Sequence, residues 1–240
     1  MLACYTIGME ENMDWLTKLE QARTEQKKSF ILDIIPTSYS ELDKALGVWG
    51  IPRGKIVEIS GHAGVGKTAL LLDIVAQAQE HGLNVVYMDL DRKFDAEFAK
   101  NRAVKCEDLL VFQPDATKPE NTLKALEALM KANLIDLIVF DTISAYGDGI
   151  TEILQGLAKN IAGTKITILL ASQIRQSFED PRDYNTPYMH LLNQYCNIRI
   201  MLKKIESIKH DSILIGKRIA VDVYKNVMAH PRTTEIEIYI

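Results

Sequence analysis

The run Gly61–Thr68, GHAGVGKT, constrains the fold more than any other feature of the sequence, because it matches the pattern G-x-x-x-x-G-K-[ST]. It follows a β-rich run, Ile56–Ser60, and opens an amphipathic segment, Lys67–His81. Glycines let the backbone curl so that successive N–H groups point inward and, with the positive end of a helix, hold a phosphate. This order of strand, loop and helix favours a phosphate-binding loop over a glycine-rich turn with an incidental lysine.

In a loop of this kind the lysine reaches the β- and γ-phosphates, and the threonine hydroxyl binds Mg²⁺. We therefore assign Lys67 to the phosphates and Thr68 to the metal. The residues expected to form the phosphate site are Gly61, His62, Ala63, Gly64, Val65, Gly66, Lys67, Thr68 and Ala69.

Apolar runs alternate with amphipathic stretches on both sides of this motif. The expected strands are Ile56–Ser60, Val85–Asp89, Leu109–Phe112, Leu137–Phe140 and Ile166–Ala171. The expected helices are Lys67–His81, Asp95–Arg102, a helix opened by a Thr117–Glu120 capping box, and Glu152–Ala162. Continuous apolar strands between amphipathic helices predict an α/β fold with a mostly parallel sheet covered on both faces.

After about Tyr195 the alternation stops. Four further strands are expected there with no helix between them: Ile198–Ile205, Ile213–Ile215, Ile219–Tyr224 and Thr234–Ile240. They predict an antiparallel C-terminal extension of the sheet. Ahead of the core, an apolar stripe over 12–29 predicts a helix, and Phe30–Ile35 a short strand. We expect residues 1–35 to form an arm that packs on its own domain or on a neighbouring subunit, and residues 36–240 to form the core.

Composition excludes several classes of protein. With 47% hydrophobic and 25% charged residues, the chain is neither collagen-like, coiled-coil nor disordered. Cys4, Cys106 and Cys196 form no C-x-x-C pair, which is typical of reduced cytosolic thiols. No apolar run approaches the ~18 residues that a membrane span needs, so we expect a cytoplasmic protein without a membrane partner. A net charge of −4 gives no general basic field for nucleic acid.

Acidic residues follow two of the expected strands. Asp141 ends the run Leu137–Phe140, where a P-loop site needs an acidic group for its metal, although many core strands end in Asp. Asp89, Asp91 and Asp95 cluster after the previous strand. Asp91 is the best placed to polarise an attacking water, and its alternative role is a helix N-cap or a solvated turn.

A neutral amide, Gln173, stands at the end of the strand Ile166–Ala171. There it could respond to the presence of a γ-phosphate, or it could cap a neighbouring backbone.

Three segments together resemble the bacterial RecA recombinases. TSYSELDKALGVWGIPRGKIVEISGHAGVGKTALLLDIVAQAQEHGLNVVYMDLD is similar to that family's lead-in to the P-loop and the segment after it. SQIR at Ser172–Arg175 resembles the family's NQIR, and VDVYKNVMAHP at Val221–Pro231 resembles its VKVVKNKVAPP region. The resemblance covers roughly Ile35–Ile240, and the helix–strand preface is similar to the family's polymerisation arm. It implies a RecA-like P-loop NTPase core.

The resemblance also implies roles for single residues. Asp141 would be the acidic partner of Mg²⁺, and Asp91 stands where the family has a catalytic glutamate. Asp95 would contact the edge of the adenine of ATP, and Phe98 would stack on its ring. Gln173 would sense the γ-phosphate and couple it to the DNA-binding loop.

By the same resemblance, Lys225 would reach the ATP of a neighbouring subunit. The family assembles as helical filaments on DNA with ATP between subunits. It promotes homologous pairing and strand exchange.

Some positions depart from the family pattern. Asp91 is one methylene shorter than glutamate, and Val227 replaces a second lysine. The first DNA loop is reduced to Ser144–Gly149, and the family's C-terminal domain has no counterpart, so we expect a short, divergent member. The second loop, Gln176–His190, lacks the double glycine and contains three acidic residues. The basic and aromatic side chains at this loop that suit single-stranded DNA are Arg175, Phe178, Arg182, Tyr184 and Tyr188.

An ordinary polar loop remains the alternative for that segment. The first functional hypothesis is a DNA-dependent ATPase that binds single-stranded DNA and acts in recombination and repair as an oligomer. The second is a regulator or mediator that binds ATP without exchanging strands. A small-molecule kinase, the third, would need a basic lid or an acceptor pocket, of which the sequence gives no sign.

Overall fold

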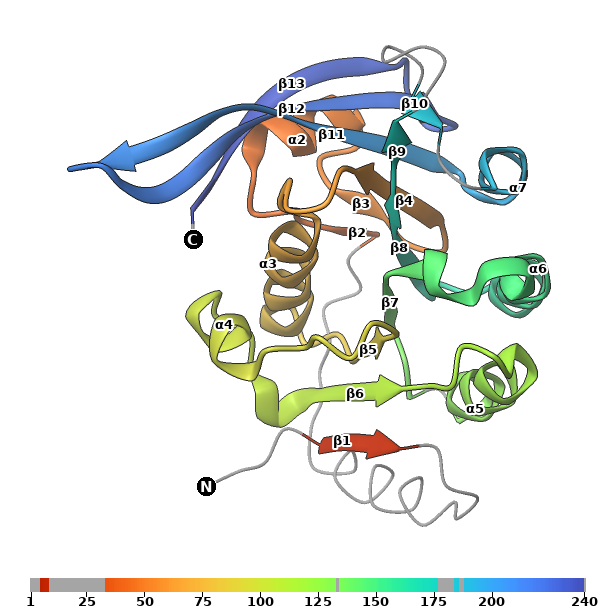
Figure 1. The fold of residues 1–240 in the computed structure, drawn as a ribbon. Helices are drawn as coiled ribbons and strands as arrows, with labels where there is room; N and C mark the ends of the chain where they lie inside the picture. The colour runs from red at the N-terminus through yellow and green to blue at the C-terminus, as the bar shows by residue number, and fades with distance from the viewer. Residues whose placement is uncertain (1–4, 9–32, 133, 177–183, 186–187, 240) are drawn as a thin grey trace.

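The computed structural model describes residues 5–8, 33–132, 134–176, 184–185 and 188–239. Their central feature is a nine-stranded sheet (Figure 1). In spatial order its strands are β1 (Tyr5–Gly8), β6 (Leu109–Gln113), β5 (Val85–Asp89), β7 (Leu137–Asp141), β8 (Thr167–Gln173), β4 (Ile56–Gly61), β11 (Ile198–His210), β12 (Ile213–Asn226) and β13 (Arg232–Tyr239). Neighbours from β1 to β11 pair parallel, and β12 and β13 continue antiparallel. The expected α/β fold with an antiparallel extension is confirmed.

Helices cover both faces of this sheet. On one face lie α2 (Ser40–Leu46), α3 (Lys67–Glu80) and α4 (Ala96–Asn101), and on the other α5 (Pro119–Lys131), α6 (Ile150–Ile161) and α7 (Met189–Tyr195) (Figure 1). Each face of the sheet has its own hydrophobic core, and alternate residues of β7 belong to one or the other. Val139 packs with α3, whereas Ile138 and Phe140 pack with α5 and α6. This two-sided burial explains why the central strands read as continuous apolar runs.

Short elements complete the described chain. They are β2 (Ile34–Ile35), β3 (Ile51–Pro52), β9 (Arg175–Gln176), β10 (Tyr184–Asn185) and the 3-10 segments Cys106–Asp108 and Ile143–Gly149. The second 3-10 segment leads directly into α6, as the short Ser144–Gly149 connection predicted.

Two local expectations are wrong. The Thr117–Glu120 capping box does not form, because Pro119 occupies the first turn of α5 and Lys118 is the N-cap. The Thr117 hydroxyl donates instead to Asp115 Oδ1 at 2.6 Å. The expected strands Ile213–Ile215 and Ile219–Tyr224 are one strand, β12, because the polar residues between them stay paired with β11.

The predicted arm is described only in part, since its helix over 12–29 lies outside the described residues. Two pieces of residues 1–35 pair with the core: β1 lies parallel to β6, and β2 lies antiparallel to β3. The arm's role in self-association stays a prediction.

Three further observations bear on the expectations from composition. Cys106 and Cys196 are buried and form no disulfide within the described part of the chain, and Cys4 lies outside it. Within the described ranges no helix is long and apolar enough to cross a membrane. Nor do those ranges contain a group of three or more His, Cys, Asp or Glu side chains placed to hold a metal ion by themselves.

Candidate nucleotide-binding site

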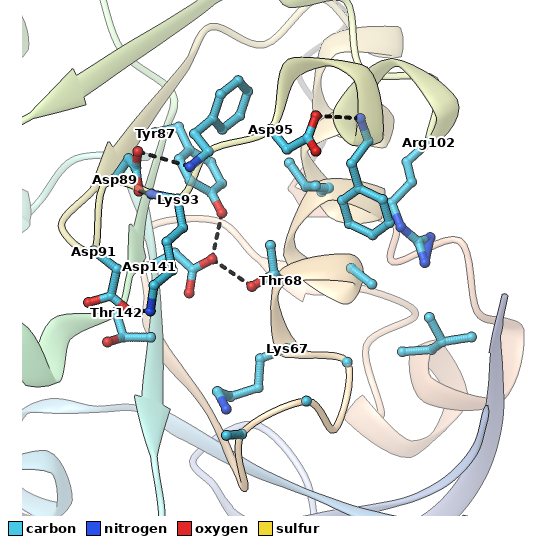
Figure 2. Close-up of a pocket in the computed structure, with 18 of the residues that line it drawn as sticks. Lys67, Thr68, Tyr87, Asp89, Asp91, Lys93, Asp95, Arg102, Asp141 and Thr142 are labelled. Carbon is cyan, nitrogen blue, oxygen red and sulfur yellow. Dashed lines mark hydrogen bonds and ion pairs between the residues drawn. The ribbon is translucent and has the colours of Figure 1, made fainter. Parts of the chain in front are cut away.

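A cavity of about 380 Å³ lies at the carboxyl ends of the parallel strands, where open α/β sheets bind their ligands. Residues from β5, β7, β8, α3 and α4 line it, together with Lys217 of β12 and the end of β13 (Figure 2). The residues predicted from sequence that line it are Ala63, Gly64, Gly66, Lys67, Thr68, Ala69, Asp91, Asp95, Phe98, Asp141 and Gln173. Gly61, His62, Val65 and Lys225 are not among its lining residues.

The glycine-rich loop between β4 and α3 forms one end of the cavity. Gly64 and Gly66 have φ of 71° and 116°, which side-chain-bearing residues rarely adopt. A Cβ at Gly66 would lie 3.1 Å and 3.2 Å from methyl groups of Ile219 and Ile238. α3 begins with neither a side-chain cap nor an acidic residue in its first turn, so no side chain competes with an anion for its first N–H groups.

Lys67 is the cation of this loop. Its Nζ donates to the carbonyls of Gly61 at 2.8 Å and His62 at 3.0 Å. Burial lowers the pKa of this ammonium, and the carboxylates of Asp141 and Asp91 oppose that shift. A phosphate oxygen would offer the ammonium a charged partner in place of neutral carbonyls.

Asp141, at the end of β7, accepts hydrogen bonds from two hydroxyl groups. Thr68 Oγ1 donates to its Oδ2 at 2.8 Å, and the Tyr87 hydroxyl donates to the same oxygen at 2.7 Å (Figure 2). Burial raises the pKa of the Asp141 carboxyl, while these two hydrogen bonds and the charge of Lys67 act in the opposite direction. A hydroxyl and a carboxylate that converge beside the glycine-rich loop are oxygen ligands of the kind that Mg²⁺ takes.

The three acidic residues at and after the end of β5 have different environments. Asp89 is buried and accepts backbone N–H groups of Lys93 and Phe94 at 2.9 Å and 3.0 Å. Asp95 is the N-cap of α4 and accepts the N–H groups of Glu97 and Phe98. The Asp91 side chain is 37% exposed, and its Oδ2 lies 3.6 Å from the ammonium of Lys93.

The end of the cavity beside α4 is largely apolar. Phe98 of α4 and Leu72 of α3 line the cavity, with Asp95, the N-cap of α4. Apolar walls with one carboxylate suit a flat base whose amino group can donate a hydrogen bond. The expected adenine contacts therefore lie on the cavity wall.

Gln173 and Lys225 lie in different places. Gln173 ends β8 and lines the cavity, and its backbone N–H donates to Ser144 Oγ at 3.4 Å. Lys225 donates to the carbonyls of Asn193 and Cys196 of its own chain, at 2.5 Å and 2.7 Å. Its predicted contact with a neighbour's nucleotide stays a prediction.

The predicted DNA contacts are described in part. Arg175 belongs to β9 and Tyr184 to β10, and these two-residue strands pair antiparallel. Tyr188 is the residue before α7. Phe178 and Arg182 lie outside the described residues.

Some lining residues escaped the sequence analysis. Tyr87, Arg102 and Lys217 line the cavity, and Lys217 Nζ donates to the Gly64 carbonyl at 2.5 Å. Arg102 had a local signal, because it lies four residues after Phe98 and so shares its helix face. Lys217 had none, since β12 reaches the loop only through the sheet.

The fold and the cavity together define a RecA-like α/β core, with a glycine-rich loop after one central strand and an aspartate ending another. A family model described as the RecA N-terminal domain matches residues 16–153, more than half of the chain. The chain belongs to the RecA family.

Curated relatives support this membership. Protein RecA of Caldanaerobacter subterraneus subsp. tengcongensis is 35% identical over 83% of this chain and 64% of its own length. Protein RecA of Heliobacterium modesticaldum is 33% identical over 86% and 65%, and that of Thermus thermophilus is 34% identical over 87% and 67%. The chain thus spans about two thirds of the length of the relatives it matches.

Proposed function

We propose that this protein is a RecA-type ATPase that binds single-stranded DNA and acts in homologous recombination and repair. The observation that carries the proposal is the convergence of Lys67, Thr68 and Asp141 on one cavity beside the glycine-rich loop. Membership of the RecA family supports the same activity.

The residues of the cavity fit ATP and Mg²⁺. Thr68 and Asp141 would hold the metal, and Lys67 with the N–H groups that open α3 would hold the phosphates. The metal, when bound, would neutralise negative charge on the phosphate oxygens. Asp91 would orient and polarise the attacking water, because its carboxylate, unlike those of Asp89 and Asp95, accepts no backbone N–H group within the described part of the chain.

Coupling to DNA would start at Gln173. This residue lines the cavity and stands two residues before β9, where the proposed DNA-binding segment begins. A γ-phosphate that binds its amide would favour one arrangement of that segment over others. Basic and aromatic side chains there would bind single-stranded DNA by charge and by stacking.

A titration of fluorescent single-stranded DNA at several salt concentrations tests the proposal. We expect tighter binding with a non-hydrolysable ATP analogue than without nucleotide, and affinity that falls steeply as salt rises. Failure to bind DNA in either state would overturn the proposed DNA-binding activity. Electron microscopy of the same mixture would show whether the protein assembles on DNA.

One observation favours a second candidate, a regulator or mediator that binds ATP but does not exchange strands. The connection at the place of the family's first DNA loop is only the short 3-10 segment Ile143–Gly149, which leads directly into α6. A strand-exchange assay separates the two: the recombinase forms joint molecules alone, whereas the mediator requires another recombinase.

A further inference from the structure

Arg102, beside the apolar end of the cavity, contacts residues of three elements that line it: α3, β13 and α4. Its Nη1 donates to both carboxylate oxygens of Asp73 in α3, at 2.8 Å and 3.0 Å. Its Nη2 donates to the carbonyl of Tyr239 in β13 at 2.6 Å. The guanidinium carbon lies 5.2 Å from the ring centroid of Phe98, as expected for a cation–π contact.

Asp73, the partner of Arg102 on α3, is held in place by a further hydrogen bond. Asp73 Oδ2 also accepts the hydroxyl of Tyr39, the N-cap of α2, at 2.7 Å. The side chains of Arg102 and Asp73 are only 11% and 12% exposed, so solvent screens this pair little. Arg102 thus ties α4 to elements that are packed in the core.

α4 is short and packs on the core through few side chains. Of its six residues only Ala99 is fully buried, and Ala96 and Phe98 are partly buried against the core. Cys106 Sγ also donates to the Ala96 carbonyl. Yet α4 carries Phe98, which lines the cavity. Its N-cap Asp95 lines the cavity as well (Figure 2). A helix this short depends on tertiary contacts for its position. Arg102 adds hydrogen bonds to α3 and β13 to that packing.

We propose that Arg102 is a positioning residue for the base of the nucleotide, holding α4 against α3 and β13. The inference rests on the proposed nucleotide binding. It adds the residue that fixes how far α4 lies from α3 and β13, and so the width of the part of the cavity that would hold the base. Arg102 does not act at the phosphate end, which Lys67 and Thr68 form. Its loss therefore weakens the binding of ligands that have a base and spares those that have only phosphates.

The test compares two ligands by calorimetry: ATP and inorganic tripolyphosphate, each with Mg²⁺. For Arg102→Met we expect ATP affinity to fall about tenfold, because a displaced wall loses its contacts with the base. Tripolyphosphate affinity stays within about twofold of wild type. Arg102→Lys keeps the charge but loses the planar fork, so its ATP affinity lies between those of wild type and Arg102→Met. This milder variant also decides the question if Arg102→Met does not fold.

Arg53→Met is the matched control. Arg53 also joins an aspartate and a backbone carbonyl, with Nη2 at 3.0 Å from Asp136 Oδ1 and Nε at 2.7 Å from the Lys165 carbonyl. It lines no part of the cavity, so ATP affinity should not change. Equal weakening of both ligands in the Arg102 variants, or an equal loss of ATP affinity in Arg53→Met, would overturn the inference. Wild-type protein that bound neither ligand would instead overturn the proposed nucleotide site, and this inference with it.

Discussion

At the residue scale, three aspartates close together in sequence have three different roles. Asp89 holds its loop by accepting backbone N–H groups and the side-chain amide of Gln113 at 2.9 Å. Asp95 caps α4. Asp91 lines the cavity with a carboxylate that no backbone N–H group of the described chain engages. The three side chains are chemically identical, so their different roles follow from which backbone N–H groups lie within hydrogen-bond distance of each.

Asp91→Glu should raise ATP turnover about tenfold if Asp91 polarises the water, because the longer side chain brings the carboxylate closer. Steady-state hydrolysis at saturating ATP measures this. An unchanged or lower rate would remove Asp91 from that role.

The companion variant Asp91→Asn keeps the size of the side chain and removes its charge. We expect turnover to fall about a hundredfold while ATP affinity changes little, since the phosphates are held by other groups. A parallel loss of affinity would show that Asp91 contributes to binding instead.

At the scale of elements, the loop between β4 and α3 depends on glycine for both conformation and space. Gly66 has φ of 116°, and two methyl groups would lie within 3.2 Å of a Cβ added there. Gly82, just beyond α3, also has positive φ, at 72°, but nothing lies within 4 Å of a Cβ there. A substitution at Gly82 would therefore introduce backbone strain alone, whereas one at Gly66 would introduce both backbone strain and steric crowding.

Gly66→Ala should therefore reduce the free energy of unfolding by about 2 kcal/mol and weaken ATP binding. Gly82→Ala should cost about 1 kcal/mol and leave ATP affinity unchanged. Urea unfolding and nucleotide titration of both variants measure the two effects. If Gly66→Ala bound ATP as tightly as wild type, the loop would not need the backbone conformation described above.

At the scale of the whole molecule, one buried ion pair joins β4 to β11, the last parallel strand before the antiparallel extension. Glu58 in β4 and Arg199 in β11 have no exposed side-chain surface, and Arg199 Nε donates to Glu58 Oε2. Ser172 at the end of β8 donates to Glu58 Oε1 at 2.5 Å. Arg199 also donates to Asn193 in α7. The network therefore runs from the strand that carries Gln173 to the helix that follows the proposed DNA-binding segment.

Arg199→Met should lower the free energy of unfolding by about 3–5 kcal/mol, because it leaves the Glu58 carboxylate buried without its ion-pair partner. Urea unfolding measures the change. Arg218→Met is the control, since Arg218 pairs with Glu206 and Glu237 while 43% exposed, and its loss should cost less than about 1 kcal/mol. Equal destabilisation by the two variants would contradict the importance of the buried pair.

The sequence was sufficient to predict the central strands and the helices beside them. Their apolar runs are continuous because both faces of the sheet are covered, and the Gly61–Thr68 pattern located the first wall of the cavity. Asp141 was predictable for the same reason, since a buried strand delivers its last residue to the carboxyl edge of the sheet.

What the sequence could not predict depends on contacts between distant segments. β1 is four residues long and is a strand only because β6 pairs with it. β12 continues through polar residues because its neighbours β11 and β13 supply partners. Lys217 and Tyr87 join the cavity through sheet geometry, which no local pattern encodes.

The central claim is that the glycine-rich loop, with Lys67, binds a nucleoside triphosphate. Calorimetric titration of the wild-type protein and Lys67→Ala with ATP and Mg²⁺ tests it most directly. We predict saturable binding of one nucleotide per chain by the wild type, and affinity at least about a hundredfold weaker for Lys67→Ala, whose turnover should also be abolished. Equal binding by the two proteins, or none by the wild type, would contradict the account.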